Sequence, residues 1–326
     1  MTEPVPASPV AIDALADEGP LEPPRSQWVD VWQQFTRHKG AMMGGAFLVF
    51  ITLAVLVGPW ILTLDPQTLD IRNKDLRPIY TIIWDGSAKV SWAHPFGTDN
   101  LGRDQLAQMI AGGRASMAVG WAAMVLSLLI GTAVGVVAGY FKRLDGILMR
   151  LTDLFLSLPI LPLLLVAVTL FRQPLRANFG PEGGMFILIV TVIGLTSWMP
   201  TARIVRGDIL ALKEREFILA ARSIGTTSGK IIRRHLLPNV LSPIMVSATL
   251  GLATAIITES ALSFLGVGFP SDYPTWGKML ADAVPRMVDF PERVMLPGIA
   301  ISLTVLSVNY LGDGLRDALD PRIRGR

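Results

Sequence analysis

The chain of 326 residues contains no cysteine and only three histidines, His38, His94 and His235, which lie far apart in the sequence. The lack of cysteine excludes disulfide scaffolds, thiol catalysis and cysteine-ligated zinc or iron–sulfur sites. Charged residues are also scarce, at 17% of the chain, against about 25% in soluble domains. The formal net charge of +3 provides no concentrated basic face for a nucleic acid. These deficits argue against a soluble protein.

Apolar residues are abundant instead, at 51% of the chain, with a mean hydropathy of +0.48. A helix needs about 20 residues to cross a hydrocarbon core of about 30 Å. Runs such as 124–130 do not alternate between apolar and polar residues, which argues against a transmembrane barrel. The sequence predicts an all-α integral membrane protein with six transmembrane helices, over residues 40–64, 115–141, 144–171, 183–205, 236–266 and 294–312.

The distribution of Lys and Arg predicts the orientation. An even number of spans places both termini on one side, and most of the 29 Lys and Arg residues then fall on that side. By the positive-inside rule both termini are cytoplasmic. This leaves 65–114 and 267–293 as extracytoplasmic loops, with 206–235 and the tail 313–326 in the cytoplasm.

The segment before the first span has two parts. Residues 1–25 are rich in proline, alanine and acidic residues, which predicts a disordered tail. Within residues 26–39, Trp28, Trp32 and Phe35 share one helical face, which predicts an amphipathic helix in the membrane interface. The basic residues around His38 precede the first span, as in a retained start-transfer helix rather than a cleaved signal peptide.

The first extracytoplasmic loop contains a turn-rich segment, 94–104. Asp99 or Asn100 is expected to cap a helix that starts near Leu101, with Asp104 close to its N-terminal dipole. Two interpretations stay open: a capped helix at the membrane surface, or a direct contact with solute or with a delivery protein.

Glycines and prolines mark special positions within the spans. Gly131, Gly135 and Gly139 repeat every four residues and allow a close helix approach. The third span carries Pro159 and Pro162 and the fourth carries Pro200, which predicts kinks or breaks. Such breaks either line a pathway or are repaired by neighbouring helices.

The cytoplasmic loop 206–235 predicts a helix, a stop at Gly225, and a second helix that is capped by Thr227 or Ser228 and continues to Pro238. Ala220 and Ala221 leave room for a partner, and apolar surface is expected from Phe217, Ile218, Leu219 and Ile224. Either a docking elbow or an amphipathic linker on anionic lipid fits this pattern. The stretch 225–230 lacks the spacing and the following Ser or Thr of a phosphate-binding loop.

The same loop resembles the permease subunits of bacterial ABC importers of the dipeptide, oligopeptide and nickel family. Their signature is Glu-Ala-Ala, three residues, Gly, nine residues, Ile, one residue, Leu-Pro. Leu219 stands at the glutamate position and His235 at the isoleucine position, while Glu216 lies one turn from Leu219. Five positions match the signature: Ala220, Ala221, Gly225, Leu237 and Pro238. Other stretches that match the second permease of this family are 94–104, 261–266, 274–277 and 311–321.

This resemblance implies a type I ABC importer permease fold in a bacterial inner membrane. It implies a homologous second permease, two cytoplasmic ABC ATPases that hold ATP and Mg, and an extracytoplasmic solute-binding protein as partners. The chain itself is expected to hold no cofactor and to be no enzyme. The elbow would couple ATP hydrolysis to alternating access through Glu216, Phe217, Leu219, Ala220, Ala221, Gly225, Leu237 and Pro238.

Two polar residues inside the spans are candidates for the pathway, Glu259 and, more weakly, Asn309. Glu259 is expected to face the pore or a polar partner such as Ser260 or Ser263, because a carboxylate in lipid is costly. Peptides are the first solute class, with nickel, glutathione or another small polar solute as alternatives. An ion-coupled transporter would need paired intramembrane charges, and a membrane enzyme a catalytic motif such as Gly-x-Ser-x-Gly, which the sequence lacks.

Overall fold

The computed structural model describes residues 27–61, 65–83, 85–86 and 88–319, and within these ranges it is helical with connecting loops and no β-strand. The predicted disordered tail 1–25 lies outside the described residues. The α-helices are α2 (Gln27–Arg37), α3 (Lys39–Ile61), α4 (Gln105–Tyr140), α5 (Lys142–Ser157), α6 (Ile160–Phe179), α7 (Pro181–Thr196), α8 (Met199–Leu212), α9 (Glu216–Ser223), α10 (Ser228–Ile231), α11 (Leu241–Phe264), α12 (Trp276–Ala283) and α13 (Pro291–Leu319). Short 3₁₀ turns lie at Ile71–Asn73, Ile79–Ile83, Leu237–Val240 and Val284–Arg286, and a π-turn at Ile232–Leu236.

Five helices of the described chain are long and apolar enough to cross a membrane: α3, α4, α6, the continuous helix Ser228–Phe264 that ends with α11, and α13. A sixth span results if α7 and α8, which meet at an angle of 42°, are taken together. The predicted all-α fold with six spans is confirmed.

The breaks within the spans fall at the predicted prolines. The expected span 144–171 is divided into α5 and α6 by extended backbone at Leu158 and Pro159. The bend between α7 and α8 lies just before Pro200, which occupies the first turn of α8. Pro162 causes no break, because it lies in the first turn of α6, where a missing N–H leaves no hydrogen bond unmade.

Helix α4 begins later than the helix expected near Leu101, so that prediction was wrong. Its N-cap is Asp104, whose Oδ1 accepts from the N–H of Ala107 at 2.8 Å. Asp99 instead accepts from the N–H groups of Leu101 and Arg103, both at 2.8 Å, and so stabilises a turn. Gly102 has φ +81° within this turn, a backbone conformation that a helix excludes.

The close helix approach predicted for the glycine repeat is confirmed. A Cβ on Gly131 would lie 2.7 Å from the carbonyl oxygen of Trp198, and one on Gly135 would lie 2.7 Å from that of Ala202. A Cβ on Gly139 would lie 2.7 Å from Cβ of Ile209 and 3.0 Å from the carbonyl oxygen of Arg206. Helix α8 therefore packs against α4 nearly backbone to backbone.

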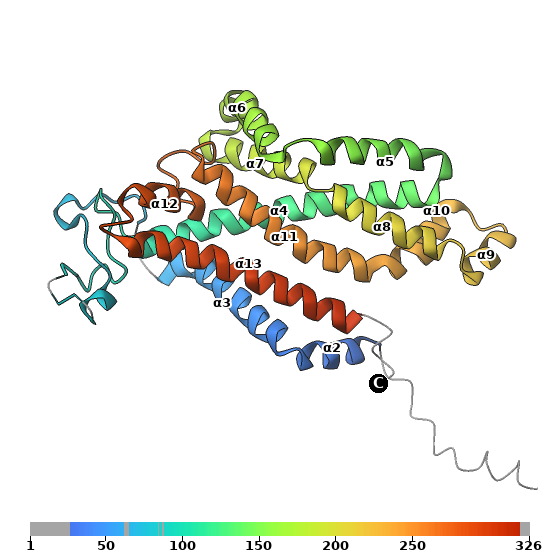
Figure 1. The fold of residues 1–326 in the computed structure, drawn as a ribbon, viewed down its shortest axis with the longest axis horizontal. Helices are drawn as coiled ribbons and strands as arrows, with labels where there is room; N and C mark the ends of the chain where they lie inside the picture. Colours follow the sequence, from blue (N-terminus) through green and yellow to red (C-terminus); the bar gives the residue numbers. More distant parts are fainter. Residues whose placement is uncertain (1–26, 62–64, 84, 87, 320–326) are drawn as a thin grey trace, which may run out of the picture.

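Figure 1 shows how the long helices are arranged. Helices α8, α11 and α13 run alongside one another, with α11 between the other two, and α3 lies beside α13. At one end of the bundle lies the α12 end, which we define as residues 65–104 and 265–293 where described. At the opposite end lies the elbow, which we define as α9, the turn at Gly225 and α10.

Candidate functional site

The elbow is a well-formed helix–turn–helix unit. Helix α9 ends in a Schellman motif: the N–H of Gly225 donates to the carbonyl of Arg222 at 2.9 Å, and the N–H of Thr226 donates to that of Ala221 at 3.1 Å. Gly225 has φ +78°, which explains the glycine at this position. Thr227 occupies the N-cap position of α10, but its side chain makes no capping hydrogen bond.

One face of α9 packs onto the protein's own core. Ile218 and Ala221 are buried together with Val136 of α4 and with Val205 and Ile209 of α8. The guanidinium of Arg222 lies 5.3 Å from the centre of the Tyr140 ring. The expectation that Ile218 and Ala221 belong to a docking surface was therefore wrong, because the helical period turns both residues inward.

The other face of the elbow is exposed. Phe217 and Leu219 are each 45% exposed and Ile224 is 82% exposed. Glu216, Ala220 and Gly225 lie on the same exposed part. An exposed apolar patch that is fixed on a rigid core is typical of a protein–protein contact.

The remaining two signature residues lie in the connection to α11. Leu237 is half-buried and Pro238 is exposed, and both belong to a 3₁₀ turn within the continuous helix Ser228–Phe264. The preceding π-turn and this 3₁₀ turn carry the helix across Pro238 without interruption. The elbow and the α11 span are thus one helical body.

Glu259 is fully buried inside the subunit rather than on a pathway face. Its Oε1 accepts a hydrogen bond of 2.7 Å from the Ser263 hydroxyl, one of the two serines expected from the sequence. Ser116 of α4 and Thr275, the residue before α12, also lie close to it. Its Oε2 has no hydrogen-bond partner among the described residues. This geometry places Glu259 at the junction of α4, α11 and α12.

A largely apolar strip with one hydroxyl lies on the exposed side of α11, and its Leu250 end lines a groove shared with α8 and α13. There α11 exposes Leu250, Thr254 and Ile257, and we call this strip the α11 face. On α13, Ser302 is exposed and Asn309 half-buried, and both fall at a seven-residue spacing with Arg316. Ser302 and Asn309 would be costly against lipid at membrane depth, so this side of α13 fits contact with water or with a polar partner.

The α11 face was not found from the sequence. Thr254 donates to the carbonyl of Leu250 at 2.9 Å, and a hydroxyl satisfied by its own helix looks ordinary in an apolar run. The sequence signal lies on the neighbouring helix instead, where Ser302, Asn309 and Arg316 of α13 recur every seven residues.

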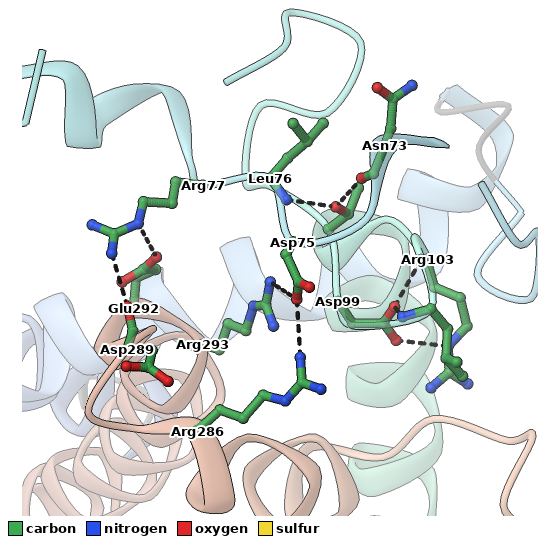
Figure 2. Close-up of polar contacts among 12 residues, drawn as sticks. Asn73, Asp75, Leu76, Arg77, Asp99, Arg103, Arg286, Asp289, Glu292 and Arg293 are labelled. Carbon is green, nitrogen blue, oxygen red and sulfur yellow. Dashed lines mark hydrogen bonds and ion pairs between the residues drawn. The ribbon is translucent and has the colours of Figure 1, made fainter. Parts of the chain in front are cut away.

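An ion-pair network holds the loops of the α12 end together. Figure 2 shows Arg286 and Arg293 directed at the carboxylate of Asp75, with nitrogen–oxygen distances of 3.2 and 3.0 Å. Arg77 donates to the carbonyl of Asp289 at 2.8 Å and lies 3.9 Å from Glu292. The loop after α3 is thus fastened to the start of α13.

The turn-rich segment 94–104 has a structural role in this network. The Nδ1 atom of His94 lies 2.8 Å from Oδ2 of Asp104, the carboxylate that caps α4. Thr98 accepts from the N–H of Leu76 at 3.0 Å and donates to the carbonyl of Asn73. Of the two open interpretations, these contacts support the capped structural segment.

A second cap stabilises the loop before this segment. Asp70 accepts from the backbone N–H groups of Arg72 and Asn73 and from the side chain of Asn73 at 2.8 Å. The hydrogen bond from the Asn73 side chain lowers the pKa of Asp70 below its ordinary value, with smaller contributions from the backbone bonds. Asp70 therefore stays ionised to a lower pH than an ordinary aspartate does.

We expect Asp75→Asn to loosen the α12 end. The substitution leaves Arg293, which is only 6% exposed, without its counter-charge; because Asp75 itself is 28% exposed, the loss is about 1–2 kcal/mol of unfolding free energy. The matched control is Asp282→Asn, which breaks an exposed pair with Lys278 worth about 0.5 kcal/mol. Limited proteolysis within 65–104 measures the difference, and equal cleavage of the two variants would contradict the prediction.

Comparison with known proteins places the chain in a family. A family model described as "Binding-protein-dependent transport system inner membrane component" matches residues 110–325. Another, described as "N-terminal TM domain of oligopeptide transport permease C", matches residues 26–78. The first of these matches includes both the elbow and the α11 face.

Relatives and a solved structure agree with this assignment. The oligopeptide transport system permease protein OppC of Bacillus subtilis is 36% identical over 300 residues, covering 92% of this chain and 91% of that protein. The dipeptide transport system permease protein DppC of Alkalihalophilus pseudofirmus is also 36% identical, with the same two coverages. An inward-facing structure of the MetNI methionine ABC transporter has a TM-score of 0.52 and 18% identity, covers 65% of this chain and 97% of that chain, and so shares the fold. The chain therefore belongs to the family of binding-protein-dependent transport system inner membrane components.

Proposed function

We propose that this chain is the translocation subunit of an ATP-driven importer of short peptides. The observation that carries the proposal is the elbow, which holds an exposed patch of Phe217, Leu219, Ala220 and Ile224 on a face backed by the protein's own core. The peptide class comes from the names of the relatives, which are oligopeptide and dipeptide permeases.

The elbow would transmit the movement of a partner ATPase to the membrane. Ile218 and Ala221 pin α9 to α4 and α8, and α10 continues without a break into α11. A displacement of the elbow would therefore turn or tilt α11 as a rigid body, and the α11 face would move with it. Rigid transmission of this kind requires packing, and the buried side of the elbow supplies it.

The remaining partners follow from the same assignment. ATP and Mg would bind to two cytoplasmic ATPases, a homologous permease would complete the pathway across the α11 face, and a solute-binding protein would deliver the peptide at the α12 end. The distribution of Lys and Arg supports an inner-membrane orientation with both termini in the cytoplasm.

The coupling role predicts that Ala220→Arg abolishes co-purification of the ATPases and reduces ATP-dependent uptake to background. The reason is that a long charged side chain on the exposed face would prevent close approach, while the core behind it stays intact. Co-purification of tagged permease, with the midpoint of thermal unfolding measured in parallel, checks both statements.

Two further variants make this experiment specific. Ala221→Arg should lower the unfolding midpoint as well, because Ala221 is 7% exposed and packs inward. Ala93→Arg adds the same charge to an exposed residue at the α12 end and should leave the ATPases bound. Wild-type amounts of ATPase on Ala220→Arg would refute the docking role.

The solute class has its own test. The ligand retained by the solute-binding protein encoded with this chain, identified by mass spectrometry after gentle purification, should be a mixture of short peptides. A single metal ion or glutathione would overturn the peptide assignment and leave the coupling role untouched.

A further inference from the structure

A groove opens at the end of the α11 face nearest the elbow, where α8, α11 and α13 meet. Its volume is about 460 Å³, within the range of about 300–1,000 Å³ for small-molecule pockets. Apolar side chains such as Ile204 and Leu250 form part of its lining, and the polar lining consists of Asp208, Ser242, Ser247 and Arg316.

The two charged residues of the groove have opposite signs and come from different helices. Asp208 of α8 is half-buried and Arg316 of α13 is exposed. Neither forms a hydrogen bond or an ion pair with another residue in the described part of the chain, although Arg206 of the same α8 is paired with Asp145 at 2.7 Å. The groove thus holds a carboxylate and a guanidinium that no other side chain of the described residues engages.

A third polar group in the groove also lacks a partner. Ser247 is 6% exposed, and its hydroxyl oxygen is buried without a hydrogen-bond partner among the described residues. A buried hydroxyl without a partner costs free energy, and so does a partly desolvated, unpaired carboxylate. An occupant that supplies polar partners would offset these costs.

We propose that this groove is a transit site for a zwitterionic short peptide, with the peptide ammonium bound by Asp208 and its terminal carboxylate bound by Arg316. This inference rests on the proposed peptide import. A short peptide carries both charges on one small molecule, and its backbone offers hydrogen-bond partners to Ser247. An apolar lipid chain offers none of these.

The geometry also explains why such a site would bind weakly. Arg316 is exposed, so solvent and salt screen its charge, and conduction needs a site that releases its ligand as readily as it accepts it. Because the site would recognise only the two charged termini, it would make no specific contact with the peptide side chains. The site would therefore accept peptides of varied sequence and discriminate against those with blocked termini.

Because this chain contains no cysteine, a direct test is possible on the assembled complex with its partner subunits in nanodiscs, without ATP, when the label is measured on this chain after it is separated from its partners. Leu250→Cys introduces a single thiol into the groove. N-ethylmaleimide reacts with the thiolate, which forms only in contact with water, so the labelling rate measures how accessible the groove is to water. Lys142→Cys at the exposed start of α5, which contributes nothing to the groove, is the control. Dialanine is the probe, and its N-acetylated, amidated analogue is the matched ligand.

We expect dialanine to slow labelling of the Leu250→Cys variant and not of the Lys142→Cys variant, and the capped analogue to have no effect on either. In the Leu250→Cys background, Asp208→Asn and Arg316→Gln should each raise the half-protecting concentration about tenfold, as for loss of one charged hydrogen bond. Asp313→Asn removes an exposed charge of α13 outside the groove and should change nothing.

Each other outcome contradicts the proposal in a recognisable way. A Leu250→Cys variant that is not labelled at all means that a helix of the second permease fills the groove. Protection by phosphatidylethanolamine without peptide means that a lipid head group does. Equal protection by dialanine and its capped analogue removes the role of the two charges. Failure of ATP-dependent uptake by the wild-type complex would instead contradict the proposed function, since protection is measured without ATP.

Discussion

Replacing Gly135 by leucine should separate α4 from α8 and destabilise the subunit by about 3 kcal/mol, the upper end of the range for overpacking. A Cβ at this position already lies 2.7 Å from the carbonyl oxygen of Ala202 and 2.8 Å from Cβ of Val205. The atom that this Cβ would meet first belongs to the backbone of α8, so no change of side-chain rotamer can relieve the clash. The free energy of unfolding, measured by SDS titration in mixed micelles, should show this loss.

Gly146→Leu is the matched control for this substitution. Gly146 lies in α5, and a Cβ built there meets nothing within 4 Å. The same change of residue should therefore cost little, and leucine even favours a helix over glycine. If the two variants unfolded alike, close packing of α4 on α8 would not be what stabilises this pair.

Trp276→Ala should be at least as damaging, with a loss of about 3–5 kcal/mol for deletion of a fully buried aromatic side chain. Trp276 is 0% exposed and its Nε1 donates to the carbonyl of Met109 at 2.9 Å. Its backbone N–H donates to the Ser116 hydroxyl at 3.3 Å, beside Glu259. The cavity would thus open where α4, α11 and α12 meet.

Two further tryptophan variants separate packing from hydrogen bonding. Trp276→Phe keeps much of the volume but leaves the Met109 carbonyl without the indole donor, at a cost of about 1–3 kcal/mol. Trp92→Ala removes a side chain that is 86% exposed and should stay within about 0.5 kcal/mol of wild type. A loss at Trp92 as large as at Trp276 would contradict the assignment of Trp276 to the core.

The spans were predictable because a membrane imposes a simple length and composition rule on helices. Helix ends were harder, because they depend on contacts between distant segments. The start of α4 is set by Gly102, whose position would place a Cβ 1.9 Å from the carbonyl oxygen of Asp70, and sequence spacing alone carries no sign of that contact.

The elbow shows the same division between local and tertiary information. Its stop at Gly225 follows from local backbone preference and was predicted. The inward direction of Ala221 depends on where α4 and α8 lie, which no local pattern contains. The groove with Asp208 and Arg316 could not be predicted from the sequence for the same reason. Those residues are distant in the chain and line one groove only because α8 and α13 both lie beside α11.

The π-turn and the 3₁₀ turn between the elbow and α11 fix a rotational register. The N–H of Leu237 donates to the carbonyl of Ile232, one residue beyond the α-helical partner, and the following turn is wound more tightly. Each residue of a helix turns the chain by about 100°. Gain or loss of one residue between Ile232 and Val240 would leave the helix whole, yet it would turn Leu250, Thr254 and Ile257 away from the side shared with α8 and α13. The length of this connection is thus as strictly constrained as the identity of any residue within it.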